Sequence, residues 1–262
     1  MQERHRNRKQ YFEEQALTTL RYVIPFVEKH REINVETTIL EIGCGEGGNI
    51  KPFLDRGCKV TGIDLSPSKI ENAEIFFEGH PQRDKLTLIV QDIYLMHEDM
   101  QFDLIVMRDV IEHIPHQEKF MAFVKRFLKP GGVIFFGFPP WYMPFGGHQQ
   151  VCDSKLSKLP WIHLFPMSIY LGLLKLFGET PTRIASLQEV KETGISIERF
   201  RRIAQLENYQ CLEEILYLFN PNYEVKFGIK PKKQLALIAA LPFVRNFFTT
   251  CMYVVLQLPN KK

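Results

Sequence analysis

An apolar run ends abruptly in a glycine-rich turn within the stretch Thr38-Ile-Leu-Glu-Ile-Gly-Cys-Gly-Glu-Gly-Gly-Asn49. This pattern predicts a buried strand that leads directly into a ligand-binding loop. Gly43, Gly45 and Gly48 fit the spacing G-x-G-x-x-G. Gly43, Gly45 and Gly47 equally fit G-x-G-x-G, so the spacing alone leaves the ligand open. Glycines let the main chain approach a ligand, whose anionic end then meets the first amides of the following helix.

Two carboxylates accompany this loop. Glu41 lies two residues before the first glycine, near the carboxyl end of the predicted strand, where it could receive the ammonium group of an amino-acid moiety. A pyrophosphate would gain nothing from a carboxylate at that position, because both groups are anionic. Asp64 ends the apolar stretch that starts at Lys59, and it follows Gly43 by twenty-one residues. An acid at this distance can accept hydrogen bonds from both ribose hydroxyls, in dinucleotides and in other adenosine-containing cofactors alike.

Four motifs follow one another in this chain: Glu41-Ile-Gly-Cys-Gly-Glu-Gly47, Gly62-Ile-Asp-Leu-Ser-Pro67, Gln91-Asp92 and Leu128-Lys-Pro-Gly-Gly132. The ordered set resembles the motifs of class I S-adenosylmethionine-dependent methyltransferases, over roughly residues 36–138. The resemblance implies S-adenosylmethionine as the cofactor and S-adenosylhomocysteine as the product. It also implies cofactor contacts from the loop and the strand ends, at Glu41, Gly43, Cys44, Gly45, Asn49, Asp64, Leu65, Asp92, Ile93 and Arg108.

The third expected strand, Leu86-Thr-Leu-Ile-Val-Gln91, delivers Asp92 to the same edge of the sheet. At this position the resembling family accepts a hydrogen bond from the adenine amino group, while the amide that corresponds to Ile93 donates to a ring nitrogen. The alternative for Asp92 is a side chain that caps its own loop.

Length and composition limit the classes of protein. A chain of 262 residues with 45% apolar and 24% charged residues can bury a substantial core. A net charge of +3 is too small to indicate a nucleic-acid partner. The five cysteines include no C-x-x-C pair, which favours reduced thiols in a cytoplasm over disulfides or a zinc site. A polar start and the absence of an apolar run of membrane-spanning length predict a cytoplasmic protein, at most on the inner surface of a membrane.

Strands and helices alternate through the first half of the sequence, which predicts a parallel sheet with a ligand crevice at the carboxyl ends of its strands. The expected fold class is α/β, a Rossmann-like, mostly parallel sheet of seven strands with helices on both faces. We expect the strands at 38–42, 58–63, 86–91, 102–107, 133–138, 211–218 and 251–258. We expect helices at 49–56, 66–77, 117–128 and 196–206, an extended segment at 223–230 and a mostly helical one at 234–248.

Two additions to the core are expected. An apolar pattern at near-helical spacing, with Pro25 as a bend, predicts a helical N-terminal cover over residues 1–35. The cofactor-binding core spans residues 36–138, and residues 191–262 complete its sheet. Residues 139–190 lie between the fifth and sixth strands, where the resembling enzymes place their acceptor-binding elaboration, so we expect an inserted lid there.

The fourth strand ends in a D-x-x-E-H pattern made by Asp109, Glu112 and His113. If a helix begins at Asp109, the two carboxylates lie one turn apart with the histidine beside them. A similar E-x-x-E-H arrangement holds a divalent ion in some quinone-pathway O-methyltransferases and in small-RNA 2′-O-methyltransferases. The aspartate departs from that pattern. The favoured interpretation is therefore no metal, with Glu112 and His113 hydrogen-bonded locally and shaping the crevice.

The expected activity is methyl transfer from S-adenosylmethionine to a small or lipid-like acceptor, at a hydroxyl rather than at nitrogen or carbon. The sulfonium is already activated, so the protein aligns the acceptor with the methyl carbon and the sulfur and excludes water. His148 in the lid is the first candidate for a general base and His113 the second. The alternative for His148 is a structural role in tying down its loop.

Two other functional classes stay open. A non-catalytic, cofactor-binding protein could use the same fold, because a fold does not fix a function. An NAD(P)-dependent oxidoreductase would use the same loop and Asp64, but no Tyr-x-x-x-Lys pair follows the fifth strand, which makes this class less favoured.

The expected lid is more apolar than a sugar or nucleotide site requires, because large apolar residues cluster between Trp141 and Phe177. Such a surface should meet a ligand, a partner subunit or a bilayer. Residues 167–177 could lie along a membrane while the basic region after Lys226 attracts anionic lipid. The alternative is a helix packed on the sheet or in the seam of a homodimer. If the surface meets a ligand, we expect a quinone, polyprenyl, acyl or aromatic acceptor.

Overall fold

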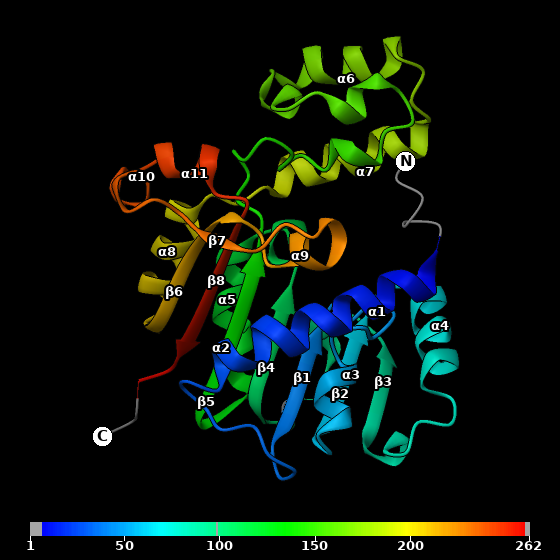
Figure 1. Ribbon diagram of the computed structural model, residues 1–262, viewed down its shortest axis with the longest axis vertical. Coiled ribbons are helices and arrows are strands. Elements are labelled where there is room, and N and C mark those ends of the chain that lie inside the picture. The colour runs from blue at the N-terminus through cyan, green and yellow to red at the C-terminus, as the bar shows by residue number, and fades with distance from the viewer. Residues whose placement is uncertain (1–6, 98, 260–262) are drawn as a thin grey trace.

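The computed structural model describes residues 7–97 and 99–259, and within them the strands form one eight-stranded sheet (Figure 1). The strand order is β3-β2-β1-β4-β5-β8-β6-β7. Strands β1 to β5 pair in parallel, β8 runs antiparallel to β5 and β6, and the edge strand β7 runs antiparallel to β6. Their bounds are β1 (Thr38–Ile42), β2 (Lys59–Asp64), β3 (Leu86–Val90), β4 (Phe102–Arg108), β5 (Leu128–Phe138), β6 (Gln210–Phe219), β7 (Lys232–Lys233) and β8 (Cys251–Gln257).

The predicted α/β class with a mostly parallel sheet is confirmed, although the described residues contain one strand more than the seven expected. The fifth strand begins before the expected residue 133, because residues 128–132 also belong to β5. The register shifts from the pair Phe102–Leu128 to the pair Leu104–Val133, so the intervening residues bulge out of a continuous strand. Gly131 adopts a φ of +73° in this bulge, which explains the glycine there.

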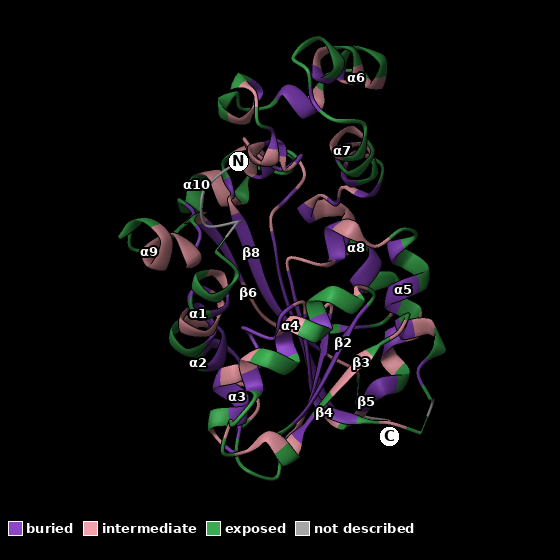
Figure 2. Cartoon of the chain, turned by 90° about the vertical axis from the view of Figure 1, so that its right-hand side faces the viewer, coloured by how far each residue is buried: buried purple, intermediate pink, exposed green. Residues whose placement is uncertain are grey.

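Two cores lie on opposite faces of the sheet. Because successive side chains of a strand point to opposite faces, β4 gives Leu104 and Val106 to one core and Ile105 and Met107 to the other. Figure 2 shows the strands buried between two helical layers. The first layer contains α1 (Arg8–Thr18), α2 (Ile24–Val27), α3 (Lys51–Asp55) and α4 (Pro67–Phe77), and the second contains α5 (Gln117–Val124) and α8 (Ile197–Leu206).

The N-terminal helices run across the sheet near the glycine loop (Figure 1). A five-residue π-helical stretch, Thr19–Val23, joins α1 to α2, and the amide of Ile24 bonds to the carbonyl of Thr19. Pro25 lies in the first turn of α2, where its missing amide costs no helical hydrogen bond. The ring of Phe12 packs against Phe77 of α4 with the centroids 5.6 Å apart. The predicted bend at Pro25 is thus a widened turn within nearly continuous helical structure.

The part of the chain between β5 and α8 forms a small body of its own at one end of the molecule (Figure 1). Its own apolar cluster contains Leu156, Tyr170, Leu174 and Leu187. The helices here are α6 (Met167–Leu176) and α7 (Pro181–Thr193). Of the ten residues of α6, Tyr170 and Leu174 are the buried ones, and Leu176 remains 79% exposed. One face of α6 therefore packs on the rest of the insertion, and the other face is exposed to solvent.

The segment after β6 differs from the prediction. Residues 223–230 were expected to be extended, but α9 (Asn222–Phe227) is helical. Pro221 adopts a φ of −48° at the start, and Gly228 adopts a φ of +71° that closes the helix. The predicted helical segment divides into α10 (Ala236–Ala240) and α11 (Val244–Phe248). Among the described residues, no helix has both the length and the apolar character needed to cross a membrane.

Candidate active site

The glycine loop leaves β1 and turns back under the following helix. The amides of Gly43 and Cys44 donate to the carbonyl of Ile63 at 2.8 and 3.1 Å, which ties the loop to β2. Gly45 adopts a φ of +56°, and a Cβ atom added there would meet nothing within 4 Å. A Cβ atom on Gly48 would instead approach the carbonyl oxygen of Phe12 to 2.6 Å. Gly45 therefore faces open space beside the loop, whereas Gly48 permits the close approach of α1.

Asp64 is fixed at the carboxyl end of β2 by two backbone amides. Its Oδ2 accepts from the amide of Gly45 at 2.8 Å, and its Oδ1 accepts from the amide of Ser66 at 2.9 Å. Each carboxylate oxygen retains capacity for a further hydrogen bond. The next residue, Leu65, is 71% exposed at the same edge. Two predicted cofactor residues and the loop thus lie together.

Glu41 begins a buried polar network that runs away from the loop. Its Oε1 accepts from the side-chain amide of Asn49 at 2.8 Å. The Oδ1 of Asn49 accepts from Arg108 at 2.8 Å and from the hydroxyl of Thr19 at 2.9 Å. Burial raises the pKa of the Glu41 carboxyl to about 8, and its Oε2 has no hydrogen-bond partner among the described residues. The network links β1, β4 and the N-terminal helices, and one buried oxygen is left to receive a donor.

Asp92 lies at the end of β3, as the sequence predicts, and caps its own turn. Its side chain accepts from the amide of Tyr94 at 3.0 Å, at the start of a short 3-10 helix. The side chain is exposed, whereas Ile93 is 7% exposed. Asp92 therefore caps its own loop, and its carboxylate can still accept a hydrogen bond from another donor.

No α-helix begins at Asp109, so the condition for stacking the two carboxylates is not met. Asp109 adopts a φ of +56°, which no helix continues, and its amide donates to the carbonyl of Gly137 at 2.7 Å. The chain follows β5 for one more residue and then enters the 3-10 helix Ile111–His113. Asp109 and Glu112 are consequently not stacked on successive turns of an α-helix.

Glu112, His113 and His148 gather at the carboxyl edge of the sheet. Their ligand atoms lie within 4.8 Å of one another, and Oε1 of Glu112 lies 3.9 Å from Nε2 of His148. The two imidazole rings make an edge contact with centroids 4.9 Å apart. Glu112 is 2% exposed, and neither of its oxygens has a hydrogen-bond partner among the described residues. The structure therefore replaces Asp109 by His148 in the predicted D-x-x-E-H cluster.

Burial decides the protonation of this cluster. It raises the pKa of the Glu112 carboxyl well above its usual range, and the nearby Asp109 adds to the rise. Burial also lowers the pKa values of His113 and His148 below their usual range. Burial therefore favours the protonated carboxyl of Glu112 and the neutral imidazoles of His113 and His148.

The cluster lies in a cavity of about 690 Å³ that opens above the sheet edge. Residues from the N-terminal helix, the insertion and α9 all line this cavity, among them Tyr11, Met143, Phe145, Gln150, Asn222, Tyr223, Lys226 and Phe227. The sequence prediction included none of the α9 residues as site residues. The sequence Asn220-Pro-Asn222 directly after β6 could have indicated them. Strand β6 runs parallel to β5 and therefore ends at the same edge of the sheet.

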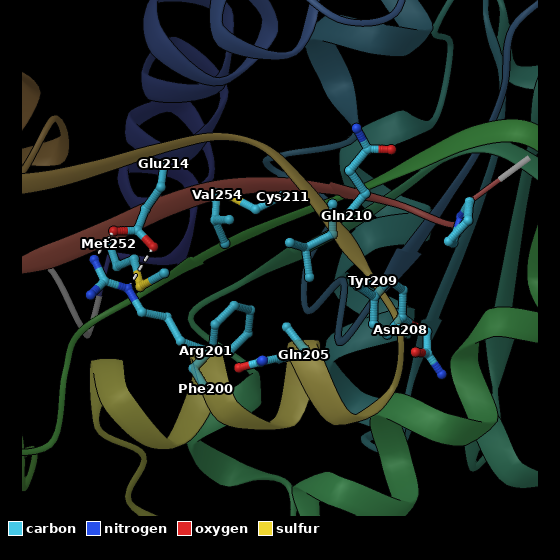
Figure 3. Close-up of a pocket in the computed structure, with 13 residues that line it drawn as sticks. Phe200, Arg201, Gln205, Asn208, Tyr209, Gln210, Cys211, Glu214, Met252 and Val254 are labelled. Atoms are coloured by element: carbon cyan, nitrogen blue, oxygen red, sulfur yellow. Dashed lines mark hydrogen bonds and ion pairs between the residues drawn. The ribbon is translucent and has the colours of Figure 1, made fainter.

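A second cavity of about 460 Å³ lies between α8 and the strands β6 and β8 (Figure 3). It shares no lining residue with the larger cavity. An ion pair between Arg201 and Glu214, at 2.9 Å, borders an apolar wall that includes Phe200 and Met252. Because its charged groups already pair with each other, this cavity lacks the unpartnered acid that marks the larger one.

Comparison with known proteins agrees with this geometry. Residues 40–136 match the sequence model of a methyltransferase domain family. A putative sarcosine dimethylglycine methyltransferase from Galdieria sulphuraria superposes with a TM-score of 0.62, at 16% identity over 94% of this chain and 87% of that one. Residues 40–136 therefore belong to a methyltransferase domain family, and the chain has the fold of S-adenosylmethionine-dependent methyltransferases.

The curated relatives match this chain over part of its length. An uncharacterized methyltransferase from Mycobacterium tuberculosis is 29% identical over 128 residues, 49% of each chain. A ubiquinone biosynthesis O-methyltransferase from Coxiella burnetii is 33% identical over 101 residues, 37% of this chain and 42% of that protein. The chain thus spans about half the length, or less, of these relatives. A geranyl diphosphate C-methyltransferase from Streptomyces coelicolor, solved with Mg²⁺, geranyl diphosphate and S-adenosylhomocysteine, has a TM-score of 0.56 at 12% identity over 90% and 80% of the chains.

Proposed function

We propose that this protein transfers a methyl group from S-adenosylmethionine to a hydroxyl of a small, partly apolar acceptor. One observation carries the proposal. The open glycine loop with Asp64 and the buried cluster of Glu112, His113 and His148 lie at the same carboxyl edge of the parallel sheet. A cofactor on the loop would therefore meet an acceptor in the cavity of about 690 Å³.

The cofactor contacts follow from the free hydrogen-bonding capacity of this edge. The unpartnered Oε2 of Glu41 receives the ammonium group of the cofactor, directly or through water. Asp64 accepts from the ribose hydroxyls, and Leu65 offers an apolar surface to the adenosine. Asp92 accepts from the adenine amino group while the amide of Ile93 donates to the ring. Arg108 and Asn49 act indirectly, because their side chains hold Glu41 in place rather than face the loop.

In the reaction the acceptor oxygen attacks the methyl carbon in line with the sulfur. The carbon–sulfur bond breaks, the electron pair stays on sulfur, and the sulfonium becomes the neutral thioether of S-adenosylhomocysteine. The proton of the hydroxyl passes to Nε2 of His148, with His113 as the second candidate. Glu112 lies 3.9 Å from that nitrogen and, when ionised, stabilises the imidazolium that forms.

The same three side chains also fit a divalent cation, because one carboxylate and two neutral imidazoles are a common donor set for zinc and related ions. A cation held by Glu112, His113 and His148 would lower the pKa of an acceptor hydroxyl bound to it. It would have to displace the proton that burial keeps on Glu112. The base mechanism also needs Glu112 in its carboxylate form, but it needs no cation, so we keep it as the proposal.

The lining of the cavity favours an amphipathic acceptor. Its hydroxyl faces the cluster, while Met143, Phe145 and Phe227 of the cavity lining offer apolar contact. Oxygen as the accepting atom agrees with the name of the Coxiella burnetii relative, and an apolar acceptor agrees with that of the Streptomyces coelicolor enzyme. Hydrophobic phenols, polyprenols and acyl alcohols are therefore the first substrates to try.

The experiment measures S-adenosylhomocysteine formed from S-adenosylmethionine with a panel of these acceptors, beside simple sugars and nucleosides. We expect product with the hydrophobic hydroxyl compounds and none without an acceptor. Product confined to hydrophilic acceptors would refute the proposed substrate class. Binding of S-adenosylhomocysteine without any turnover would favour a non-catalytic protein, and thermal protection by nicotinamide cofactors alone would favour an oxidoreductase.

A further inference from the structure

Residues 229–248 leave much apolar side-chain surface uncovered. They include β7, α10 and α11, and the two helices lie beside each other at one end of the molecule (Figure 1). Of the five residues of α10 none is buried, and of the five of α11 Asn246 alone is. Leu237 is 75% and Phe243 68% exposed. Further exposed apolar side chains in the segment are Ile229, Leu235, Leu241, Val244 and Phe248. Clusters of this kind mark interaction surfaces.

The outward position of Phe243 is built into the fold. Phe243 adopts a φ of +61°, a strained conformation for a bulky residue. Glu198 of α8 holds it there, because the carboxylate accepts from the amide of Phe243 and from Nε of Arg245, both at 2.9 Å. The buried side chain of Asn246 donates to the same carboxylate and accepts from the amide of Ile197. A strained backbone conformation, stabilised by Glu198, therefore places an aromatic side chain on the surface.

Positive charge accompanies this apolar surface. Lys230, Lys232 and Lys233 are exposed within the segment, and the sequence contains no acid after Glu224. Glu198 of α8, which contacts this segment, already accepts hydrogen bonds from Phe243, Arg245 and Asn246. Exposed apolar side chains flanked by lysines match the interface of an anionic bilayer, where lipid chains meet negatively charged headgroups.

The segment adjoins the acceptor cavity. Helix α9 directly precedes it, and Asn222, Tyr223, Lys226 and Phe227 of α9 line the cavity of about 690 Å³. Phe227 is 51% exposed and lies two residues before Ile229. The same short stretch of chain thus borders both the cavity and the exposed apolar surface.

We propose that residues 229–248 dock this protein on an anionic lipid surface, with Leu237 and Phe243 entering the bilayer interface and the acceptor cavity opening beside the lipid. Docking itself follows from the exposed side chains and their charges. Only the entry of a lipid-like acceptor from the bilayer rests on the proposed function.

The test is co-sedimentation of the full chain with vesicles of phosphatidylcholine alone or with about one quarter phosphatidylglycerol. We expect binding to the anionic vesicles that weakens as salt is raised. Leu237→Gln together with Phe243→Asn should weaken that binding by at least about tenfold, because two large apolar side chains no longer leave water. Asparagine is among the non-glycine residues that most often adopt a positive φ. The control is Ile75→Gln, which removes a side chain that is 64% exposed on α4, on the other side of the molecule (Figure 1).

Equal binding by the wild-type chain and the double variant, or no wild-type binding to anionic vesicles, would overturn the proposal. A wild-type dimer that the double variant converts to a monomer, without vesicle binding, would overturn it in favour of a second copy on this surface. Calorimetry with S-adenosylhomocysteine on the same variants separates this outcome from failure of the proposed function. We expect the double variant to bind the product as the wild type does.

Discussion

Nε2 of His148 lies 3.9 Å from Oε1 of Glu112, and neither oxygen of Glu112 accepts a hydrogen bond from the described residues. The two side chains come from the turn after β4 and from the insertion after β5. Burial raises the pKa of the carboxyl and lowers that of the imidazole, so it favours a proton on Glu112 and a neutral His148. The pair becomes an effective base only when that proton leaves.

The first prediction concerns the pH dependence of catalysis. We expect kcat/KM to rise with pH, because the protonated pair is a poor proton acceptor and the deprotonated pair a good one. The midpoint should lie above the usual carboxyl range, since the pKa of Glu112 is raised. The measurement is the initial rate of S-adenosylhomocysteine formation across the pH range at saturating cofactor.

Glu112→Gln keeps the shape of the side chain and removes its titration. It should flatten the rise and lower kcat/KM by about 10²–10⁴-fold, while product binding by calorimetry stays unchanged. The same profile in the variant and the wild type would remove Glu112 and His148 from the proton transfer.

The second prediction concerns metal. We expect turnover to persist in excess chelator, because the base mechanism uses the free electron pair of His148 and needs no cation. Activity lost on chelation and restored by manganese or zinc would convert Glu112, His113 and His148 into a cation site. An independent readout is the melting temperature with added zinc, which a cation site raises in the wild type but not in Glu112→Gln.

The third prediction concerns proton release on cofactor binding. Glu41 is buried with a pKa of about 8, so its carboxyl is mostly protonated at neutral pH. An ammonium group beside it favours the carboxylate and lowers that pKa, so binding should release a proton. Calorimetry with S-adenosylhomocysteine in buffers of different ionisation enthalpy measures the number of protons released on binding. We expect release approaching one proton near pH 7, and none from Glu41→Gln. Equal heats in all buffers would show that Glu41 does not meet the ammonium group.

The sequence predicted the parallel half of the sheet well because local and global signals coincide there. In β1 and β2 an apolar run stops at a glycine or an acid, and in the structure β1 ends directly before Gly43 while β2 ends at Asp64. Asp64 and Glu41 could be placed at the same edge for this reason, because the strand ends of a parallel sheet meet at one edge. Their roles toward a cofactor stay predictions.

The structure of the second half of the chain was predicted less well, because tertiary contacts determine it. Gly137 in β5 takes the hydrogen bond of Asp109 and holds that residue at a positive φ, which no helical spacing in D-x-x-E-H reveals. His148 reaches Glu112 only because the insertion folds back over the sheet edge. In α9 the alternation of apolar residues resembled a strand, whereas Pro221 and Gly228 fix a short helix.

Calorimetric titration with S-adenosylhomocysteine, comparing the wild type with Asp64→Ala, tests the central claim most directly. The account predicts one site per wild-type chain and a loss of roughly 1.5–3 kcal/mol in the folded variant, about 10- to 150-fold in Kd, because a carboxylate that accepts from the ribose is removed. Matching melting curves without ligand would establish that the variant is folded. An unchanged Kd in the variant, or no binding to the wild type, would contradict the assignment of this edge as the cofactor site.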